Sequence, residues 1–185
     1  MNAIRKLRTP IHIVAVIMLL LASGALTAQQ RKGWKAGEFR GLVAGKSTRK
    51  DIVRVLGDSA PKKTAHLEVY GYAGKGDFGS NVTVEVNRAT GVVETITERF
   101  SPNITRTQAR KKFGENYSED QYSIADCPHE GSNAMAYRDP NGPIGLIVYP
   151  KQGLVLWPNQ EGFDISAALY LAEPLPGKKP VCRKQ

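Results

Sequence analysis

The stretch "VTVEVNRATGVVETI" (residues 82–96) alternates apolar and polar residues, then turns and alternates again. Valine at every second position from Val82 to Val86 predicts a strand with one buried face. The turn "NRATG" ends at Gly91, a residue that takes a positive φ without steric cost. Residues 92–99 then form the returning strand, so this stretch predicts an antiparallel β-hairpin.

Similar patterns recur along the chain. "IGLIVYPKQGLVLWP" (144–158) also predicts strand, turn and strand, around Gly153. Upstream of the two hairpins, "TRKDIVRVLG" (48–57) and "TRTQARKKFG" (105–114) share Thr, Arg and the closing Gly at the same spacing. Two matches in the same order predict an internal duplication.

The two upstream stretches predict short capped helices. Thr48 with Asp51, and Thr105 with Gln108, have the spacing of a capping box, and glycine closes each stretch. The predicted strands that follow are 67–70, 82–86 and 92–99 in the first copy, and 134–138, 144–149 and 154–157 in the second. The predicted fold is therefore α+β: two tandem units, each a short capped helix followed by an antiparallel β-meander. Residues 164–174, "DISAALYLAEP", fit either a helix or an alternating strand.

The first copy resembles a known family. The "GKST" start (45–48), the Thr-x-x-Asp-Ile helix, the Leu-Gly stop and the "VNRATGVVETI" hairpin resemble the small outer-membrane-assembly lipoproteins of the BamE (SmpA/OmlA) type. They equally resemble the tandem units of β-lactamase inhibitor protein. The resemblance covers residues 39–100 and, more faintly, 105–157. It implies a helix-plus-meander fold and an envelope-assembly or inhibitor-type role with a protein partner, here in tandem and without the lipobox cysteine.

The N-terminus predicts export. Arg5, Lys6 and Arg8 precede an apolar run over 11–21 and the small-residue stretch "ASGALTA" (22–28), as in a secretory signal peptide. We expect a periplasmic or secreted protein, with an uncleaved inner-membrane anchor as the alternative. The predicted organisation is a signal peptide (1–28), a basic linker (29–38), a first unit (39–101), a second unit (102–173) and a Pro/Lys-rich tail (174–185).

Positive charge is concentrated in the tails. The chain has 26 basic and 17 acidic residues, and three of the basic ones fall within 1–28, so the mature chain carries a net charge of +6. "RKGWK" (31–35) and "GKKPVCRK" (177–184) are basic. Solvated tails are the preferred interpretation, and contact with anionic lipid or cell-wall polymer is the alternative function. An exported chain is not expected to bind nucleic acid.

Two cysteines, Cys127 and Cys182, are expected to form a disulfide in an oxidising compartment. "DCPHE" (126–130) supplies only two good metal ligands, Cys127 and His129, so no metal site is predicted. A thiol-dependent enzyme with Cys127 as nucleophile and His129 as base is the less favoured alternative.

Two glycine-rich stretches resemble nucleotide-binding motifs, but neither meets the full requirements of its motif. "GLVAGKST" (41–48) has Arg40 where a phosphate-binding loop needs its first glycine. Gly74, Gly76 and Gly79 have dinucleotide-fingerprint spacing but lie between two predicted strands instead of between a strand and a helix. No cofactor is predicted.

The sheet faces suggest where a partner binds. If Val82, Val84 and Val86 face the helix, alternation predicts that Tyr70 and Tyr72 face outward. In the second copy the outward positions become apolar and must be covered, by residues 164–174 or by a partner. We therefore predict a contact surface made of Tyr70, Tyr72, Tyr149 and Trp157. The predicted function is a non-catalytic binding or scaffold module of the cell envelope.

Overall fold

The structure is a computed structural model that describes residues 33–125 and 136–180. In these residues, eleven strands and two α-helices follow one another in an order that begins and ends with strands. The elements are β1 (Glu38–Phe39), β2 (Leu42–Val43), α2 (Arg49–Leu56), β3 (Lys62–Lys63), β4 (Leu67–Tyr72), η1 (Asp77–Gly79), β5 (Asn81–Asn87), β6 (Val93–Thr105), α3 (Arg106–Phe113), β7 (Ser118–Ile124), β8 (Ala136–Arg138), β9 (Ile144–Tyr149), η2 (Pro150–Gln152), β10 (Leu154–Pro158) and β11 (Asp164–Leu171).

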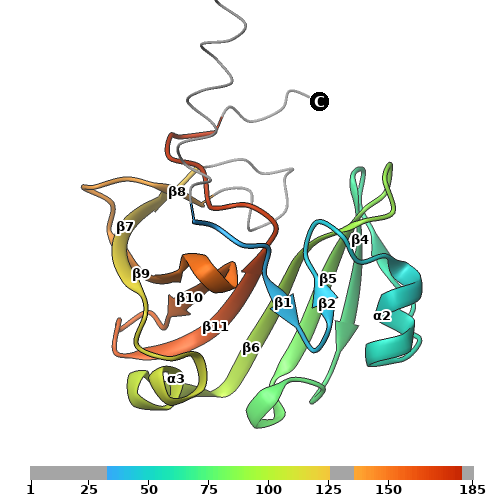
Figure 1. The fold of residues 1–185 in the computed structure, drawn as a ribbon, viewed down its shortest axis with the longest axis horizontal. Coiled ribbons are helices and arrows are strands. Elements are labelled where there is room, and N and C mark those ends of the chain that lie inside the picture. The colour runs from blue at the N-terminus through green and yellow to red at the C-terminus, as the bar shows by residue number, and fades with distance from the viewer. Residues whose placement is uncertain (1–32, 126–135, 181–185) are drawn as a thin grey trace, which may run out of the picture. The chain divides into compact units, whose positions relative to one another are not determined.

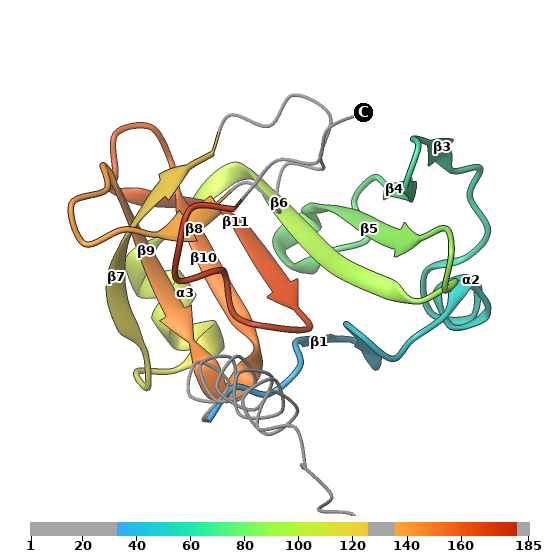
Figure 2. The ribbon, with the colours of Figure 1, turned by 90° about the horizontal axis from the view of Figure 1, so that it is seen from above.

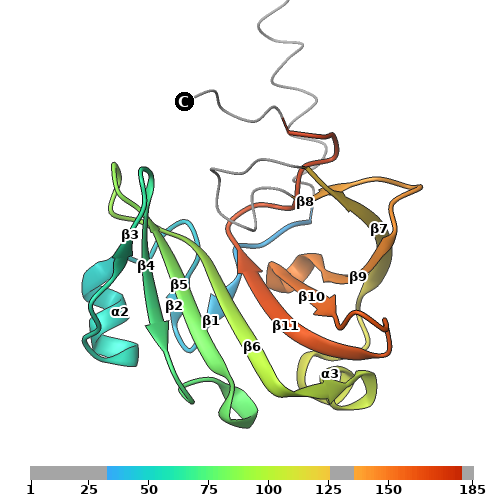
Figure 3. The ribbon, with the colours of Figure 1, turned by 180° about the vertical axis from the view of Figure 1, so that it is seen from behind.

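One antiparallel sheet dominates the fold. Its nine strands have the order β3-β4-β5-β6-β11-β10-β9-β7-β8, and β1 pairs separately with β2. Figure 1 shows β6 and β11 side by side in the middle of the sheet, and Figure 3 shows the same order from behind. In Figure 2, β7, β9, β10 and β11 run at a steep angle to β5, as expected of a long sheet with accumulated twist.

The predicted fold class is wrong. The described chain is mostly β, with two α-helices, and nine of its strands form one sheet instead of two helix-plus-meander units. The difference lies in Asp164–Leu171, which is strand β11 and pairs with β6 on one side and with β10 on the other. Without β11, β6 and β10 would each have an edge of unpaired backbone N–H and C=O groups. As an extended strand, β11 pairs with the backbone groups of both edges.

Both capped helices are confirmed. At α3, the Gln108 N–H donates to the Thr105 Oγ1 (3.1 Å), and the Thr105 N–H donates to the Gln108 Oε1 (2.8 Å). At α2, the Asp51 carboxylate accepts hydrogen bonds from both the backbone N–H and the hydroxyl of Thr48, each at 2.9 Å. The closing glycines both take a positive φ.

The central hairpin is also confirmed. β5 and β6 pair from Asn81↔Arg99 to Val86↔Val93, and the turn between them lies at the predicted residues. β9 has the predicted bounds, and the predicted strand 154–157 lies within β10. Of the predicted strand 134–138, Ala136–Arg138 is strand β8 and the rest lies outside the described residues.

One face of the sheet carries the main core. Both helices and the β1–β2 hairpin contribute to it, through Phe39, Leu42, Ile52, Leu56, Ala109 and Phe113. On β5 the buried residues alternate with partly exposed ones. In this half, one face of the sheet is therefore buried and the other faces solvent.

The second half of the sheet is apolar on both faces. A second core cluster on β7, β9, β10 and β11 includes Leu146, Val155 and Leu169, and Trp34 packs against it together with Leu175. The predicted need for a cover is therefore met by segments before β1 and after β11. Residues 164–171 are part of the sheet and do not cover it.

Candidate functional site

The second half of the sheet splits between β9 and β10. The β9–β10 ladder ends at Ile147↔Leu156, whereas β9 continues back to Ile144, paired with β7. On the other side, β10 continues to Pro158, paired with β11. We call the gap beyond the last rung, between Ile144–Leu146 and Trp157–Pro158, the β9–β10 fork.

Two features of β10 explain why the ladder stops. Pro158 has no backbone N–H, so it cannot donate a ladder hydrogen bond. The register between β10 and β11 also shifts between Trp157 and Pro158, and such an irregularity bends a strand away from its neighbour. On β9, Pro143 lies directly before the first paired residue and is another position without a donor.

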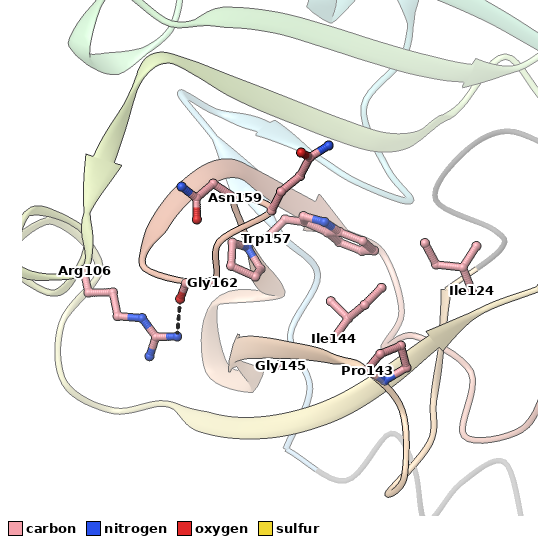
Figure 4. Close-up of a pocket in the computed structure, with 10 residues that line it drawn as sticks. Arg106, Ile124, Pro143, Ile144, Gly145, Trp157, Asn159 and Gly162 are labelled. Atoms are coloured by element: carbon pink, nitrogen blue, oxygen red, sulfur yellow. Dashed lines mark hydrogen bonds between the residues drawn. The ribbon is translucent and has the colours of Figure 1, made fainter.

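The fork holds a half-open cavity of about 350 Å³. Figure 4 shows the cavity with its lining side chains as sticks. The lining residues are Arg106, Ile124, Pro143, Ile144, Gly145, Trp157, Pro158, Asn159, Gln160 and Gly162.

One wall of the cavity is apolar. Trp157 and Ile144 are partly buried against the second core cluster, and in Figure 4 they face one another across the cavity. Ile124, at the end of β7, is 53% exposed although it is a large aliphatic residue. Apolar side chains that converge on an open cavity are typical of a binding site.

Gly145 leaves space in the middle of the fork. A Cβ built at this position would meet only the Gln121 side chain, at 3.6 Å, which is an ordinary contact. Gly145 lies between Ile144 and Leu146 on β9, so a side chain here would point to the opposite sheet face from theirs. Gly145 itself belongs to the lining, and it leaves that part of the lining without a side chain.

The polar rim is held by its own hydrogen bonds. Arg106, the first residue of α3, donates to the Gly162 carbonyl (3.2 Å, dashed in Figure 4) and contacts the Glu119 carboxylate at 3.1 Å. The Asn159 Oδ1 accepts from the backbone N–H groups of Phe163 (3.1 Å) and Asp164 (3.3 Å). The loop that closes the cavity is thus fixed at both ends.

The predicted contact surface is corrected at its three tyrosines. Tyr70, Tyr72 and Tyr149 are all buried in the main core, and only Trp157 remains partly exposed. Tyr70 lies directly opposite Val84, and direct partners on antiparallel strands share a face. The strand register therefore places these tyrosines on the buried face of the sheet. Alternation along a single strand does not show which of its two faces is buried.

The buried tyrosines hold the helix ends. The Tyr72 hydroxyl donates to the Gly57 carbonyl (3.1 Å) after α2, and the Tyr149 hydroxyl donates to the Gly114 carbonyl (3.0 Å) after α3. Burial raises the pKa of Tyr149 to about 12. These hydroxyls satisfy carbonyl groups that a helix end leaves without an intrahelical partner.

The predicted disulfide and thiol residues, Cys127, Cys182 and His129, lie outside the described residues. Within the described ranges, no three His, Cys, Asp or Glu side chains gather in a way that would bind a metal ion. Sequence reasoning selected Trp157 but missed Ile144, Gly145 and Arg106. The sequence signal that could have indicated the fork was a pair of prolines, Pro143 and Pro158, at the ends of two strands that otherwise pair.

Fold and site together define a mostly-β chain with a cavity inside its sheet. None of the protein-family models, curated proteins or solved structures compared with this chain matches it. In residues 33–125 and 136–180, no helix has both the length and the apolar character needed to cross a membrane.

Proposed function

We propose that this chain is an exported, non-catalytic binding module of the cell envelope, and that the β9–β10 fork receives an extended segment of a partner protein. The observation that carries the proposal is the fork itself: two strands diverge around an apolar cavity that contains Trp157 and lacks a side chain at Gly145. The signal-peptide pattern of residues 1–28 supports the compartment.

An extended peptide suits the fork because the part of β9 that lies beyond the last rung no longer pairs with β10. β-Strand addition draws its affinity from main-chain hydrogen bonds and its specificity from side-chain pockets. A cavity of about 350 Å³ accepts one or two apolar side chains of such a segment. Trp157, Ile144 and Ile124 are then the apolar contacts, and Asn159 and Gln160 form the polar rim.

The test is selection from a random peptide library displayed on phage, with the immobilised full chain as bait. Selected peptides are expected to compete with one another for one site and to change the fluorescence of Trp157. Gly145→Val adds a side chain to the cavity lining at a position where a Cβ meets only an ordinary contact, and it is expected to weaken peptide binding at least about tenfold. Trp157→Ala is expected to weaken it as well.

A matched control exists on β4. Gly71 also lies in a strand, has no atom within 4 Å of a built Cβ and lines no part of the cavity, so Gly71→Val makes the same chemical change elsewhere. It is expected to bind the peptides as the unaltered chain does. Enrichment of no peptide, or equal binding by Gly145→Val and the unaltered chain, would contradict the proposal.

A further inference from the structure

Lys112 of α3 is enclosed, although lysine side chains are usually exposed. Its side chain is 17% exposed, and its Nζ lies 4.7 Å from the centre of the Phe113 ring. The centres of the Phe78 and Phe100 rings are 5.5 and 5.7 Å from the same atom, and these two rings pack edge-on against each other. Three aromatic rings therefore shield the Lys112 amine from solvent.

Two carboxylates contact this amine. The Lys112 Nζ lies 2.6 Å from the Asp77 Oδ2, and it donates to the Glu98 Oε2 at 3.0 Å. Asp77 lies in the loop between β4 and β5, and Glu98 lies on β6. The Glu98 side chain is fully buried, whereas that of Asp77 is 42% exposed. Folding thus brings one amine and two carboxyl groups together from three separate elements.

Glu98 is placed to move protons. Its Oε1 accepts hydrogen bonds from the Asp77 backbone N–H (2.5 Å) and the Ser80 hydroxyl (2.7 Å). Its Oε2 accepts from the Tyr170 hydroxyl (3.2 Å) as well as from Lys112. These bonds hold the carboxylate beside the amine and away from water. A carboxylate in this position can take a proton from the amine and return it to a neighbouring oxygen.

Asp77 is placed to be attacked. The Lys112 Nζ lies within about 4 Å of the Asp77 Cγ, because Oδ2 and Cγ are one C–O bond of about 1.2 Å apart. Reacting atoms in a near-attack arrangement are about 3–3.5 Å apart, so only a small movement is needed. On the other side, the Arg40 guanidinium donates to the Asp77 Oδ1 (2.8 Å), where negative charge develops during attack on Cγ.

The loop is held closely against this cluster. Phe78 has φ 55° and ψ 24°, a backbone conformation that residues other than glycine rarely adopt. In this conformation the Phe78 ring lies beside the Lys112 amine. A Cβ at Gly76 would lie 2.8 Å from the Glu98 Oε1, so the loop backbone approaches the buried carboxylate directly. The loop therefore both positions Asp77 and shields Lys112.

We infer that Lys112 and Asp77 condense after folding into an isopeptide bond, an amide that joins the lysine Nζ to the aspartate Cγ, with Glu98 as the proton carrier. The bond ties α3 covalently to the loop between β4 and β5. Like a disulfide, such a link restricts the unfolded chain, and unlike a disulfide it does not depend on a redox partner. None of the three residues lines the β9–β10 fork, so this modification is separate from peptide binding there.

The step needs no further reactant. Glu98 takes one proton from the Lys112 ammonium, and the freed lone pair attacks the Asp77 Cγ to form the C–N bond. That proton and a second one from the same nitrogen pass through Glu98 to Oδ2, the C–O bond breaks, and Oδ2 leaves as water. The third proton remains on the amide nitrogen. One ammonium and one carboxylate thus give one amide and one water, and Glu98 ends as it began.

The structure contains the ion pair, which is the state before condensation. Both reacting groups start charged, so two proton transfers must accompany the loss of water. We expect linkage to take days and freshly purified chain to be mainly unlinked, so unfolding measurements on fresh chain report on the ion pair. The aromatic rings favour condensation, because apolar surroundings disfavour the charges that it removes.

The test is the intact mass of the full chain, measured after reduction and denaturation, before and after incubation of the folded chain for several days in warm neutral buffer. The mass of a growing fraction is expected to fall by that of one water molecule. Tryptic digestion should then release a branched peptide in which residues 76–88 are joined to residues 112–138, because trypsin does not cut after a lysine whose amine is part of an amide.

Matched variants assign the roles. Lys112→Arg keeps the positive charge but removes the amine, and it is expected to lose no water. Glu98→Gln removes the proton carrier and is expected to slow linkage at least about tenfold. Lys111→Arg makes the same change at an exposed neighbour on α3 and is expected to link as fast as the unaltered chain.

An unchanged mass of the folded, unaltered chain after incubation would overturn this proposal. Loss of water without the branched peptide would also overturn it, as would equal loss from Lys112→Arg or from chain kept unfolded in urea. Equal rates for Glu98→Gln and the unaltered chain would exclude Glu98 as the proton carrier. Circular dichroism establishes that each variant is folded before its mass is compared.

Discussion

At the scale of single residues, the buried pair of Glu98 and Lys112 is the most demanding feature. Glu98 has no exposed surface and relies on Lys112, Ser80, Tyr170 and the Asp77 backbone for its hydrogen bonds. A buried charge stripped of its partner is costly, whereas an apolar replacement of a whole pair is often tolerated. This arrangement therefore makes a sharp prediction about stability.

Lys112→Met is expected to lower the free energy of unfolding by about 3 kcal/mol, because it leaves the Glu98 carboxylate buried without its cation. Urea unfolding at neutral pH measures the change. Lys111→Met, one residue earlier on the exposed side of α3, is the control and should change stability by no more than about 0.5 kcal/mol. A loss below about 1 kcal/mol for Lys112→Met would contradict this account of the pair.

Asp77 makes the free energy of unfolding depend on pH in the acidic range. Burial alone would raise the pKa of its carboxyl, but hydrogen bonds from Lys112 and Arg40 outweigh burial and lower the pKa below its usual value. A lowered folded-state pKa stabilises the fold above the unfolded-state pKa of about 3.9, and this stabilisation is lost as pH falls through the folded-state value.

The corresponding measurement compares the unaltered chain with Asp77→Asn by urea unfolding across a pH series. The difference in unfolding free energy should stay constant near neutral pH and narrow below about pH 4, where the aspartate becomes protonated. A difference that persists unchanged in strong acid would show that the carboxylate charge is not what stabilises the loop.

At the scale of elements, the helices depend on their caps. α3 is short and carries three basic residues in its last turn, so its N-terminal capping box and its buried Ala109 and Phe113 hold it in place. Helices this short are marginal in isolation. The hydroxyl of Thr105 therefore contributes measurably to α3.

Thr105→Ala is expected to reduce the unfolding free energy by about 1 kcal/mol, the usual cost of losing an N-cap side chain. Thr107→Ala removes a hydroxyl from an exposed position inside the same helix and serves as the control. Thermal or urea unfolding measures both variants. Equal effects at the two positions would mean that the cap bonds do not stabilise α3.

At the scale of the whole molecule, β11 makes the two halves of the sheet interdependent. It pairs with β6 over seven residues and with β10 over five, and it contributes to both core clusters. Neither set of strands keeps its edge protected without it. The described chain should therefore unfold as one unit.

Unfolding followed by far-ultraviolet circular dichroism reports on the strands of both halves. Tryptophan fluorescence reports on the second half, where Trp34 and Trp157 both pack against the second core cluster. The two transitions are expected to coincide. Two separated transitions would instead mean that the halves of the sheet fold independently, and Ala168→Asp in β11 should shift a single coincident transition as a whole.

Local patterns in the sequence determined much of this structure. The turn after Asn87, the Thr48 and Thr105 caps and the bounds of β9 all follow from neighbouring residues, because turn chemistry, capping and alternation act over a few positions. Residues 164–171 fitted two local structures, and only pairing with β6 and β10, far away in the sequence, selected the strand.

The candidate sites were decided by tertiary structure. Register between strands, a long-range property, placed Tyr70 and Tyr149 in the core and left Trp157 at the fork. The fork exists because β9 and β10 follow different neighbours, β7 and β11, and residues 76–80 are held by hydrogen bonds and an ion pair to Glu98 and Lys112 from other elements. Alternation in one segment carries no information about which strand or helix will lie beside it.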